Sequence, residues 1–187
     1  MKVLFLIQGR NAAASRYRVL QYIPYLTSRG VEASVSPYPR TFKENIRFFR
    51  AAPNYDVVFL QRKRFDPPRL VLLRRKAKRI IYDFDDAVMY RGPQANDPVS
   101  KGRRRRFVRM IKASDFVITG NQFLLSEVLP YNANGMVIPT PIDLSRYAVE
   151  SIAREKKVSL AWVVREAAEK YVADRWPLFN QSKRDDA

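Results

Sequence analysis

The fold of this chain is set by a stretch at its start, Met1-Lys-Val-Leu-Phe-Leu-Ile-Gln-Gly-Arg-Asn11. Val3 to Ile7 is an unbroken apolar run of strand length, which suits a strand buried on both faces of a parallel sheet. The residues after it are small and polar, and they lead towards a helix at Ser15. A strand, a flexible loop and a helix in this order predict the first unit of an α/β fold.

Similar apolar runs recur along the chain, with helix-like stretches between them. We expect these further strands at residues 31–35, 57–60, 79–82, 116–119 and 136–138. Strands that alternate with helices imply right-handed crossovers and a doubly wound parallel sheet. The sequence therefore predicts a Rossmann-like α/β domain over residues 1–140, followed by a small two-helix segment over residues 141–187.

Capping residues mark where the helices should begin and end. Ser15 is expected to cap a helix that runs to about Ser28, with a kink at Pro24 and a stop at Gly30. Asp66 and Pro67 predict a cap followed by a first-turn proline. Two further helices are expected at residues 100–112 and from Asn121 to just before Pro130.

Charge is distributed unevenly between the two parts. The chain carries a formal net charge of +17, and residues 1–140 hold 26 of its 35 basic and 10 of its 18 acidic side chains. An excess of this size predicts an anionic partner, either a phosphate-bearing ligand, an anionic membrane surface or nucleic acid. A solvated basic surface without a partner is the alternative.

Cysteine and histidine are both absent, which excludes disulfides, thiolate chemistry and the commonest general base and metal ligand. We expect no metal and no cofactor. The first seven residues are too short for a signal-peptide apolar region, and no apolar run approaches the roughly 20 residues that span a bilayer. A cytoplasmic protein is therefore expected, with peripheral association at the inner face of the membrane as one possibility.

Three loops that follow strands carry the candidate site residues. Ligands of doubly wound sheets bind at the carboxyl ends of the strands. There the sequence places a glycine-containing loop, a cluster of carboxylates and a further turn. The residues are Gly9, Ser15, Arg16 and Arg18; Asp83, Asp85 and Asp86; and Gly120 and Asn121. The carboxylates could bind sugar hydroxyls, hold a divalent cation or act as a base, or could simply cap a helix and pair with arginines.

In this order, the motifs resemble the N-terminal half of a family 4 glycosyltransferase with the two-domain GT-B architecture. They are Ser15-Arg-Tyr-Arg18, Tyr82-Asp-Phe-Asp-Asp-Ala87, Ser114-Asp-Phe-Val-Ile-Thr-Gly-Asn121 and Val137-Ile-Pro-Thr-Pro-Ile-Asp143. The resemblance covers about residues 1–147, and the last motif is similar to the stretch where such enzymes leave their first domain for the second.

The resemblance implies an acceptor-binding role, because the N-terminal domain of that family mostly holds a cell-envelope or lipid-linked saccharide. Gly9, Ser15, Arg16 and Arg18 would line the cleft, Asp83 and Asp86 would face the acceptor, and Gly120 and Asn121 would border it. Family members often use a histidine near the acceptor, and Asp85 is the carboxylate that could replace it as base. No second domain of this kind follows, so we expect a truncated chain that is not active alone. It would need a nucleotide-sugar-binding domain from elsewhere.

The last part of the chain has a different pattern. Apolar residues recur at helical spacing before and after Lys156-Lys157-Val158, with Ser159 as a cap and Trp176-Pro177 as the end. The stretch Ile152–Val172 resembles the helices of a ribbon-helix-helix (CopG-type) regulator. That resemblance implies a homodimer that reads DNA with a preceding strand, here Gly135–Pro141. A DNA-binding regulator fused to a glycosyltransferase fragment is therefore the alternative function; its helices could equally pack on the sheet.

Basic runs at residues 62–64, 74–79 and 101–106 are also prominent. Arg103, Arg104, Arg105, Arg106 and Arg109 would lie on one helix, with Phe107, Val108, Met110 and Ile111 as its apolar contacts. Such a helix could lie on an anionic bilayer, each charge near the surface contributing about 1 kcal/mol. Nucleic acid would use the same charges, but aromatic side chains are not interleaved with them as a base-stacking platform requires.

Overall fold

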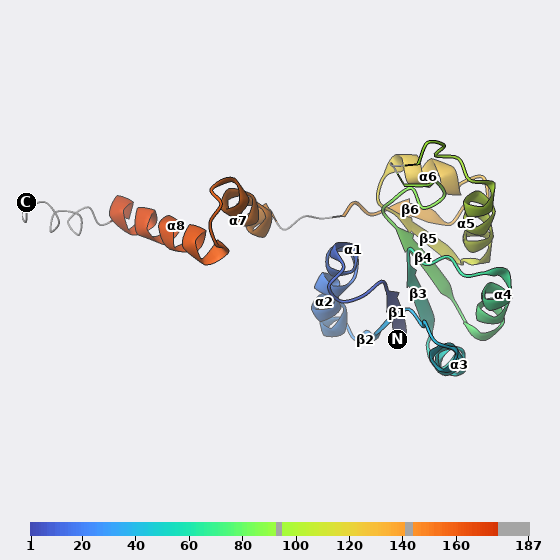
Figure 1. Cartoon of the computed structure of the whole chain (residues 1–187). Helices are drawn as coiled ribbons and strands as arrows, with labels where there is room; N and C mark the ends of the chain where they lie inside the picture. Colours follow the sequence, from blue (N-terminus) through green and yellow to red (C-terminus); the bar gives the residue numbers. More distant parts are fainter. Residues whose placement is uncertain (93–94, 141–143, 176–187) are drawn as a thin grey trace, which may run out of the picture. The chain divides into compact units, whose positions relative to one another are not determined.

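The computed structural model describes residues 1–92, 95–140 and 144–175, and the chain separates into two compact units, Met1–Pro141 and Ile142–Ala187. Unit 1 is built on one six-stranded sheet (Figure 1). Its strands are β1 (Lys2–Ile7), β2 (Glu32–Pro37), β3 (Val57–Gln61), β4 (Ile80–Phe84), β5 (Phe116–Thr119) and β6 (Gly135–Val137). All pair in parallel in the order β2-β1-β3-β4-β5-β6, so the predicted Rossmann-like fold is confirmed.

Helices cover both faces of this sheet. The helices α1 (Ala13–Arg18) and α2 (Ile23–Ser28) lie on one face, while α3 (Phe42–Ala51), α4 (Pro67–Lys76), α5 (Lys101–Ala113) and α6 (Gln122–Val128) lie on the other (Figure 1). Strand order explains this unequal division. Only the β1-to-β2 connection moves in one direction along the sheet, and right-handed crossovers put the remaining helices on the opposite face.

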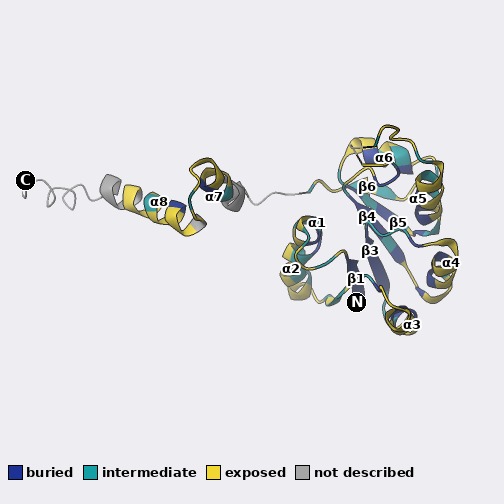
Figure 2. Cartoon of the chain, viewed as in Figure 1, coloured by how far each residue is buried: buried dark blue, intermediate teal, exposed yellow. Residues whose placement is uncertain are grey.

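The apolar run of β1 supplies both cores because successive side chains point to opposite faces of the sheet. Val3, Phe5 and Ile7 pack with the turn that follows α1 and with α2, whereas Leu4 and Leu6 join the larger core under α3 to α6. Figure 2 shows the inner strands β1, β3 and β4 as the buried centre of the unit, whereas the edge strands β2 and β6 are more exposed. A buried run of this kind fixes β1 in the middle of the sheet.

One predicted helix is divided in two. The stretch after β1 forms α1, a short 3-10 turn at Leu20–Tyr22, and then α2, with Pro24 in the first turn of α2. A proline there costs no backbone hydrogen bond, so it begins a helix where we predicted a kink. Ser15 does not cap the helix as predicted, because Ala12 precedes the first turn and Ser15 lies buried inside α1.

Other predicted helix boundaries are confirmed. The side chains of Asp66, Ser100 and Asn121 each accept a hydrogen bond from a backbone N–H in the first turn of α4, α5 and α6. Gly30, after α2, has a φ of +79°, which a glycine adopts without strain. No signal had been assigned to α3, although Thr41 and Glu44 form a reciprocal capping box at its start.

Unit 2 contains α7 (Leu144–Glu155) and α8 (Leu160–Arg175). The predicted break falls between them, Lys157 has a φ of +53°, and the Ser159 side chain accepts from the Trp162 N–H. Ala153 and Val163 are buried in this pair, and Lys156 forms an ion pair with Glu166. The predicted end at Trp176-Pro177 lies outside the described residues. Dimerisation through these helices and the division into domains at residues 1–140 and 141–187 stay predictions.

The strand that a ribbon-helix-helix module would need belongs to the sheet instead. Gly135–Val137 forms β6 and pairs in parallel with β5, with Thr119 opposite Val137. Those backbone groups are therefore engaged within unit 1, and the DNA-binding alternative receives no support from the fold.

The apolar side of α5 faces the core. Phe107, Met110 and Ile111 are fully buried, and Phe107 packs edge-on against Phe84. The prediction that these residues supply apolar contacts to a bilayer is therefore wrong, because the same hydrophobic spacing that suits a membrane also suits a core. Across the described part of the chain, no helix has both the length and the apolar character needed to cross a membrane.

Candidate functional site

The predicted site residues gather at the carboxyl edge of the sheet. Ile7, Gln61, Phe84 and Thr119 end β1, β3, β4 and β5, and the loops that follow them meet there. The strand order reverses between β1 and β3, because β2 lies on one side of β1 and β3 on the other. Such a reversal separates the outgoing loops and is where open α/β sheets bind their ligands.

Arg18 and Asp83 form a buried ion pair in the middle of this edge. Their side chains are 3% and 2% exposed, and Arg18 Nε donates to both carboxylate oxygens of Asp83 at 3.0 and 3.1 Å. Arg18 Nη1 also donates to the Ile138 carbonyl at 3.0 Å and to Thr140 Oγ1 at 2.9 Å. Burial raises the pKa of the Asp83 carboxyl, and the Arg18 guanidinium opposes that rise. The pair joins α1 and β4 to the segment after β6.

Ser15 extends this buried polar layer. Its hydroxyl donates to Gln61 Oε1 at 2.8 Å, and both side chains are fully buried. Within the described residues, Gln61 Nε2 has no hydrogen-bond partner. Ser15 therefore joins α1 to the end of β3 through its hydrogen bond to Gln61. Its contact with an acceptor stays a prediction.

Arg62, which directly follows β3, holds the carboxylates of the β4 loop. Its Nε lies 3.9 Å from Asp85 Oδ1, and its Nη2 donates to Asp86 Oδ2. Arg62 has a φ of +57°, in the left-handed region that non-glycine residues rarely adopt. Such strain is commonest at functional sites, where the surrounding structure enforces it. Sequence reasoning noted Arg62 only as part of a basic run.

The three carboxylates differ in how they are engaged. Both oxygens of Asp83 accept from Arg18, and Asp86, which is mostly exposed, pairs with Arg62. Asp85 Oδ1 is buried and, in the part of the chain that the structure describes, accepts no hydrogen bond. No group of acidic residues converges closely enough to hold a metal ion in that same part. Asp85 is therefore the carboxylate that keeps a buried oxygen without a hydrogen bond from the described residues.

Gly120 and Asn121 lie beside Asp85 on the loop after β5. Asn121 Oδ1 accepts from the Leu124 N–H at 2.9 Å and caps α6. A Cβ on Gly120 would lie 2.9 Å from the Asp85 Cα, closer than such atoms approach. The loop after β5 can therefore touch the loop after β4 only because residue 120 has no side chain.

We expect Gly120→Ala to displace the Asp85 backbone and to destabilise unit 1 by about 1–3 kcal/mol, the usual cost of overpacking. Urea unfolding of the full chain measures the loss. Gly9→Ala is the matched control, because nothing lies within 4 Å of its added Cβ. Equal stabilities for the two variants would contradict the close approach.

The remaining loop residues are not drawn into this cluster. The Gly9 carbonyl accepts from the Ala12 N–H at 3.2 Å in the turn before α1. Arg16 is exposed and its guanidinium lies over the Tyr17 ring, 5.6 Å from the centroid. Gly9 thus lies in the turn between β1 and α1, and Arg16 lies in α1. Contact of either residue with an acceptor stays a prediction.

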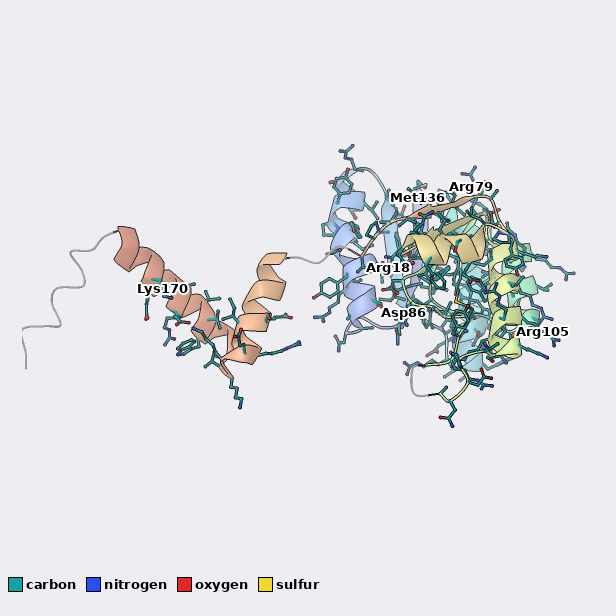
Figure 3. All side chains as sticks on the ribbon, turned by 90° about the horizontal axis from the view of Figure 1, so that it is seen from above. Arg18, Arg79, Asp86, Arg105, Met136 and Lys170 are labelled. Carbon is teal, nitrogen blue, oxygen red and sulfur yellow. The ribbon has the colours of Figure 1, made fainter. Side chains whose placement is uncertain are left out.

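The five arginines of α5 do not act as one group. Arg104 pairs with Glu127 of α6, and Arg103 Nη1 donates to the Tyr90 carbonyl at 2.9 Å. Arg105 and Arg109 are exposed, and Figure 3 shows Arg105 on the side of the unit far from Arg18 and Asp86. Arg103 and Arg106 instead line a pocket of about 710 Å³ that opens at the carboxyl edge.

That pocket unites residues which are distant in the sequence. It is bordered by the ends of β1, β2, β3 and β4 and by α5, and its charged lining residues are Arg62, Lys63, Arg64, Asp86, Arg91, Arg103 and Arg106. Tyr38, which sequence reasoning missed, also lines it, and Lys63 Nζ lies 5.3 Å from the centre of its ring. No sequence signal marked Tyr38, because its role depends on where β2 ends.

Comparison with solved structures shows which folds the chain resembles. Crystal structures of HepE from Anabaena match 83% of this chain at 16% identity with a TM-score of 0.53 for the complex with UDP and glucose, and 84% at 15% identity with a TM-score of 0.48 for the complex with UDP-glucose. In both cases the match spans 50% of the HepE chain. No family model and no curated protein matches the sequence.

Proposed function

We propose that unit 1 is the acceptor-binding half of a GT-B glycosyltransferase, one that resembles family 4. Such an enzyme would transfer a sugar from a nucleotide-sugar to a cell-envelope or lipid-linked acceptor. The observation that carries this proposal is the carboxylate cluster at the carboxyl end of β4, with Asp85 incompletely bonded. Its support is the match of 83% of this chain to half of HepE, which was crystallised with UDP and glucose.

Asp85 is the proposed general base. A base must accept a proton from the acceptor hydroxyl, so its carboxylate needs an oxygen that is not already saturated. Asp83 is saturated by Arg18, and Asp86 is drawn to Arg62. Asp85 meets the requirement, because its buried Oδ1 accepts no hydrogen bond within the described residues. The acceptor-binding roles of Gly9, Ser15, Arg16, Arg18, Asp83, Asp86, Gly120 and Asn121 are part of the same proposal.

The donor half would come from outside unit 1. In the described residues the chain contains one parallel sheet, and the helices α7 and α8 do not form a second. We therefore expect the purified chain to bind acceptor saccharides but to turn over no nucleotide-sugar by itself.

Product analysis of the purified chain with a panel of labelled nucleotide-sugars, including UDP-glucose, tests this expectation. Each donor is incubated with and without a separately produced GT-B donor domain and a lipid extract as acceptor. Transfer only when the donor domain is present supports the proposal. Robust turnover by the chain alone contradicts the assignment as a half-enzyme, and no transfer under any condition contradicts the glycosyltransferase assignment.

We further propose that an anionic bilayer is contacted through α3 and α4 and not through α5. Large apolar side chains are exposed on both helices: Phe42 is 81% exposed and Val71 51%, and Ile46 and Leu72 are partly exposed. A groove of about 610 Å³ between them has Arg40, Arg50, Arg69 and Lys76 on its border and, among the described residues, no carboxylate. Exposed apolar groups ringed by cations suit an anionic lipid surface.

Vesicle sedimentation tests this surface. We expect the full chain to bind vesicles containing phosphatidylglycerol more strongly than pure phosphatidylcholine, and Phe42→Ser to weaken that binding roughly tenfold, as the loss of one inserted aromatic side chain implies. Phe123→Ser is the matched control, since Phe123 is also exposed but lies on α6. An equal effect of both substitutions would rule out a specific α3–α4 contact.

A further inference from the structure

The basic pocket at the carboxyl edge combines arginines from two separate runs of the sequence. Arg62, Lys63 and Arg64 follow β3, and Arg103 and Arg106 lie one turn apart on the first half of α5. The fold brings both runs to one cavity of about 710 Å³, in which Asp86 is the single acidic side chain among the described lining residues. The cavity therefore concentrates positive charge where the sheet already positions ligands.

Much of this charge is not neutralised by the protein. Asp86 is paired with Arg62, and Arg91 is paired with Asp97. Considering only described residues, no carboxylate lies within 4.0 Å of Arg64, Arg103 or Arg106. Arg64 and Arg103 donate to the carbonyls of Val88 and Tyr90, which orients their guanidinium groups without balancing their charge.

The pocket also places these cations under mutual repulsion. Burial lowers the pKa of the Arg64 guanidinium, and the charges of Arg103, Arg106 and Arg62 lower it further. Close like charges repel one another, and a bound anion would relieve that cost. The Tyr38 hydroxyl is buried at the same pocket, beside the Lys63 backbone. A phosphoryl oxygen could accept from it.

We propose that this pocket binds a phosphate or pyrophosphate group, with Arg64, Arg103 and Arg106 as its principal cationic contacts. Guanidinium groups match phosphate oxygens with paired, charge-assisted hydrogen bonds. Because the pocket adjoins Asp85 and Asp86, the group would belong to the acceptor of the reaction proposed above. Only this last step rests on the proposed function, since anion binding follows from the pocket itself. The acceptor class is therefore a phosphorylated or diphosphate-linked saccharide.

Isothermal titration of the full chain with inorganic pyrophosphate at low ionic strength tests the pocket. We expect saturable one-site binding that weakens with added salt. The double variant Arg103→Gln/Arg106→Gln should bind roughly 100-fold more weakly, about tenfold for each lost guanidinium contact. The double variant Arg105→Gln/Arg109→Gln removes the same charge from the same helix outside the pocket, and it should retain the binding.

Two results would overturn the proposal: no saturable binding of pyrophosphate, or an equal loss in the two double variants, which would show only a general electrostatic attraction. Circular dichroism of each variant verifies that α5 remains folded. Phosphatidylcholine vesicles doped with a polyprenyl diphosphate, compared with a water-soluble sugar phosphate, distinguish a lipid-linked from a free source. Loss of binding of either ligand in the Arg103→Gln/Arg106→Gln variant supports the pocket proposal.

The pyrophosphate titration and the sugar-transfer assay test the pocket and the glycosyltransferase assignment separately. If pyrophosphate binding requires Arg103 and Arg106 but no sugar transfer is found with a donor domain, the pocket stands and the assignment fails. If transfer occurs and is indifferent to both arginines, the assignment stands and the pocket does not hold the acceptor phosphate, while the titration alone decides whether the pocket binds an anion.

Discussion

Replacing Arg18 with methionine is expected to destabilise unit 1 by about 3–5 kcal/mol, because it leaves the Asp83 carboxylate buried without a counter-charge. Asp83 is 2% exposed, so water cannot replace the lost guanidinium. Methionine keeps most of the side-chain volume and thus isolates the electrostatic part of the effect. Urea unfolding of the full chain, followed by circular dichroism, gives the difference in free energy of unfolding.

A double variant distinguishes two quantities: the destabilisation caused by an unpaired Asp83 carboxylate, and the net contribution of the Arg18–Asp83 ion pair to stability. Arg18→Met/Asp83→Leu removes both charges, and buried pairs replaced by apolar residues are often neutral in stability. We therefore expect it to recover most of the loss. A single-variant cost below about 1 kcal/mol, the range of surface ion pairs, would show that the pair is hydrated and not buried as described.

The same substitution has a local consequence. Arg18 donates to the Ile138 carbonyl and to Thr140, which lie directly after β6. Amide hydrogen exchange in residues 136–140 should therefore accelerate in Arg18→Met beyond the change expected from global stability. Arg18 thus ties the end of the sheet to the first strand–helix unit.

The second large effect concerns Asp85 in the enzyme reconstituted with a donor domain. Asp85→Asn is expected to lower kcat roughly 10²- to 10⁴-fold, the usual contribution of a general base. Asparagine preserves the size of the side chain but cannot take up the proton of the acceptor hydroxyl. KM for the acceptor should change little, because the substitution removes basicity and leaves hydrogen bonding largely intact.

Asp86→Asn is the matched control for this prediction. Asp86 lies next in the sequence and pairs with Arg62, but its side chain is mostly exposed. We expect a change of less than about tenfold in kcat, since a surface ion pair contributes at most about 1 kcal/mol. Similar losses in both variants would mean that the carboxylate cluster acts through its charge and that Asp85 has no special role.

Local sequence determined the elements of this protein and most of their boundaries. The apolar run at Val3–Ile7 specified a strand buried on both faces, and Asp66, Ser100 and Asn121 specified helix starts. These features depend on side chains and backbone groups only a few residues apart, so a linear pattern contains the information. The carboxyl edge could be predicted as the candidate site as well. In a parallel sheet the direction of the strands places the loops that follow them at one edge.

Tertiary structure decided which residues of the site are free and which are engaged. The sequence placed Asp83, Asp85 and Asp86 in one cluster without showing their partners. In the structure Asp83 is buried against Arg18, whereas Asp85 Oδ1 is buried without a hydrogen bond from the described residues. The sequence treated Arg62–Arg64 and Arg103–Arg106 as separate runs, which the sheet brings to one pocket. Distances between elements remote in the chain depend on strand order and crossover direction. Charge compensation depends on those distances, and no local pattern encodes them.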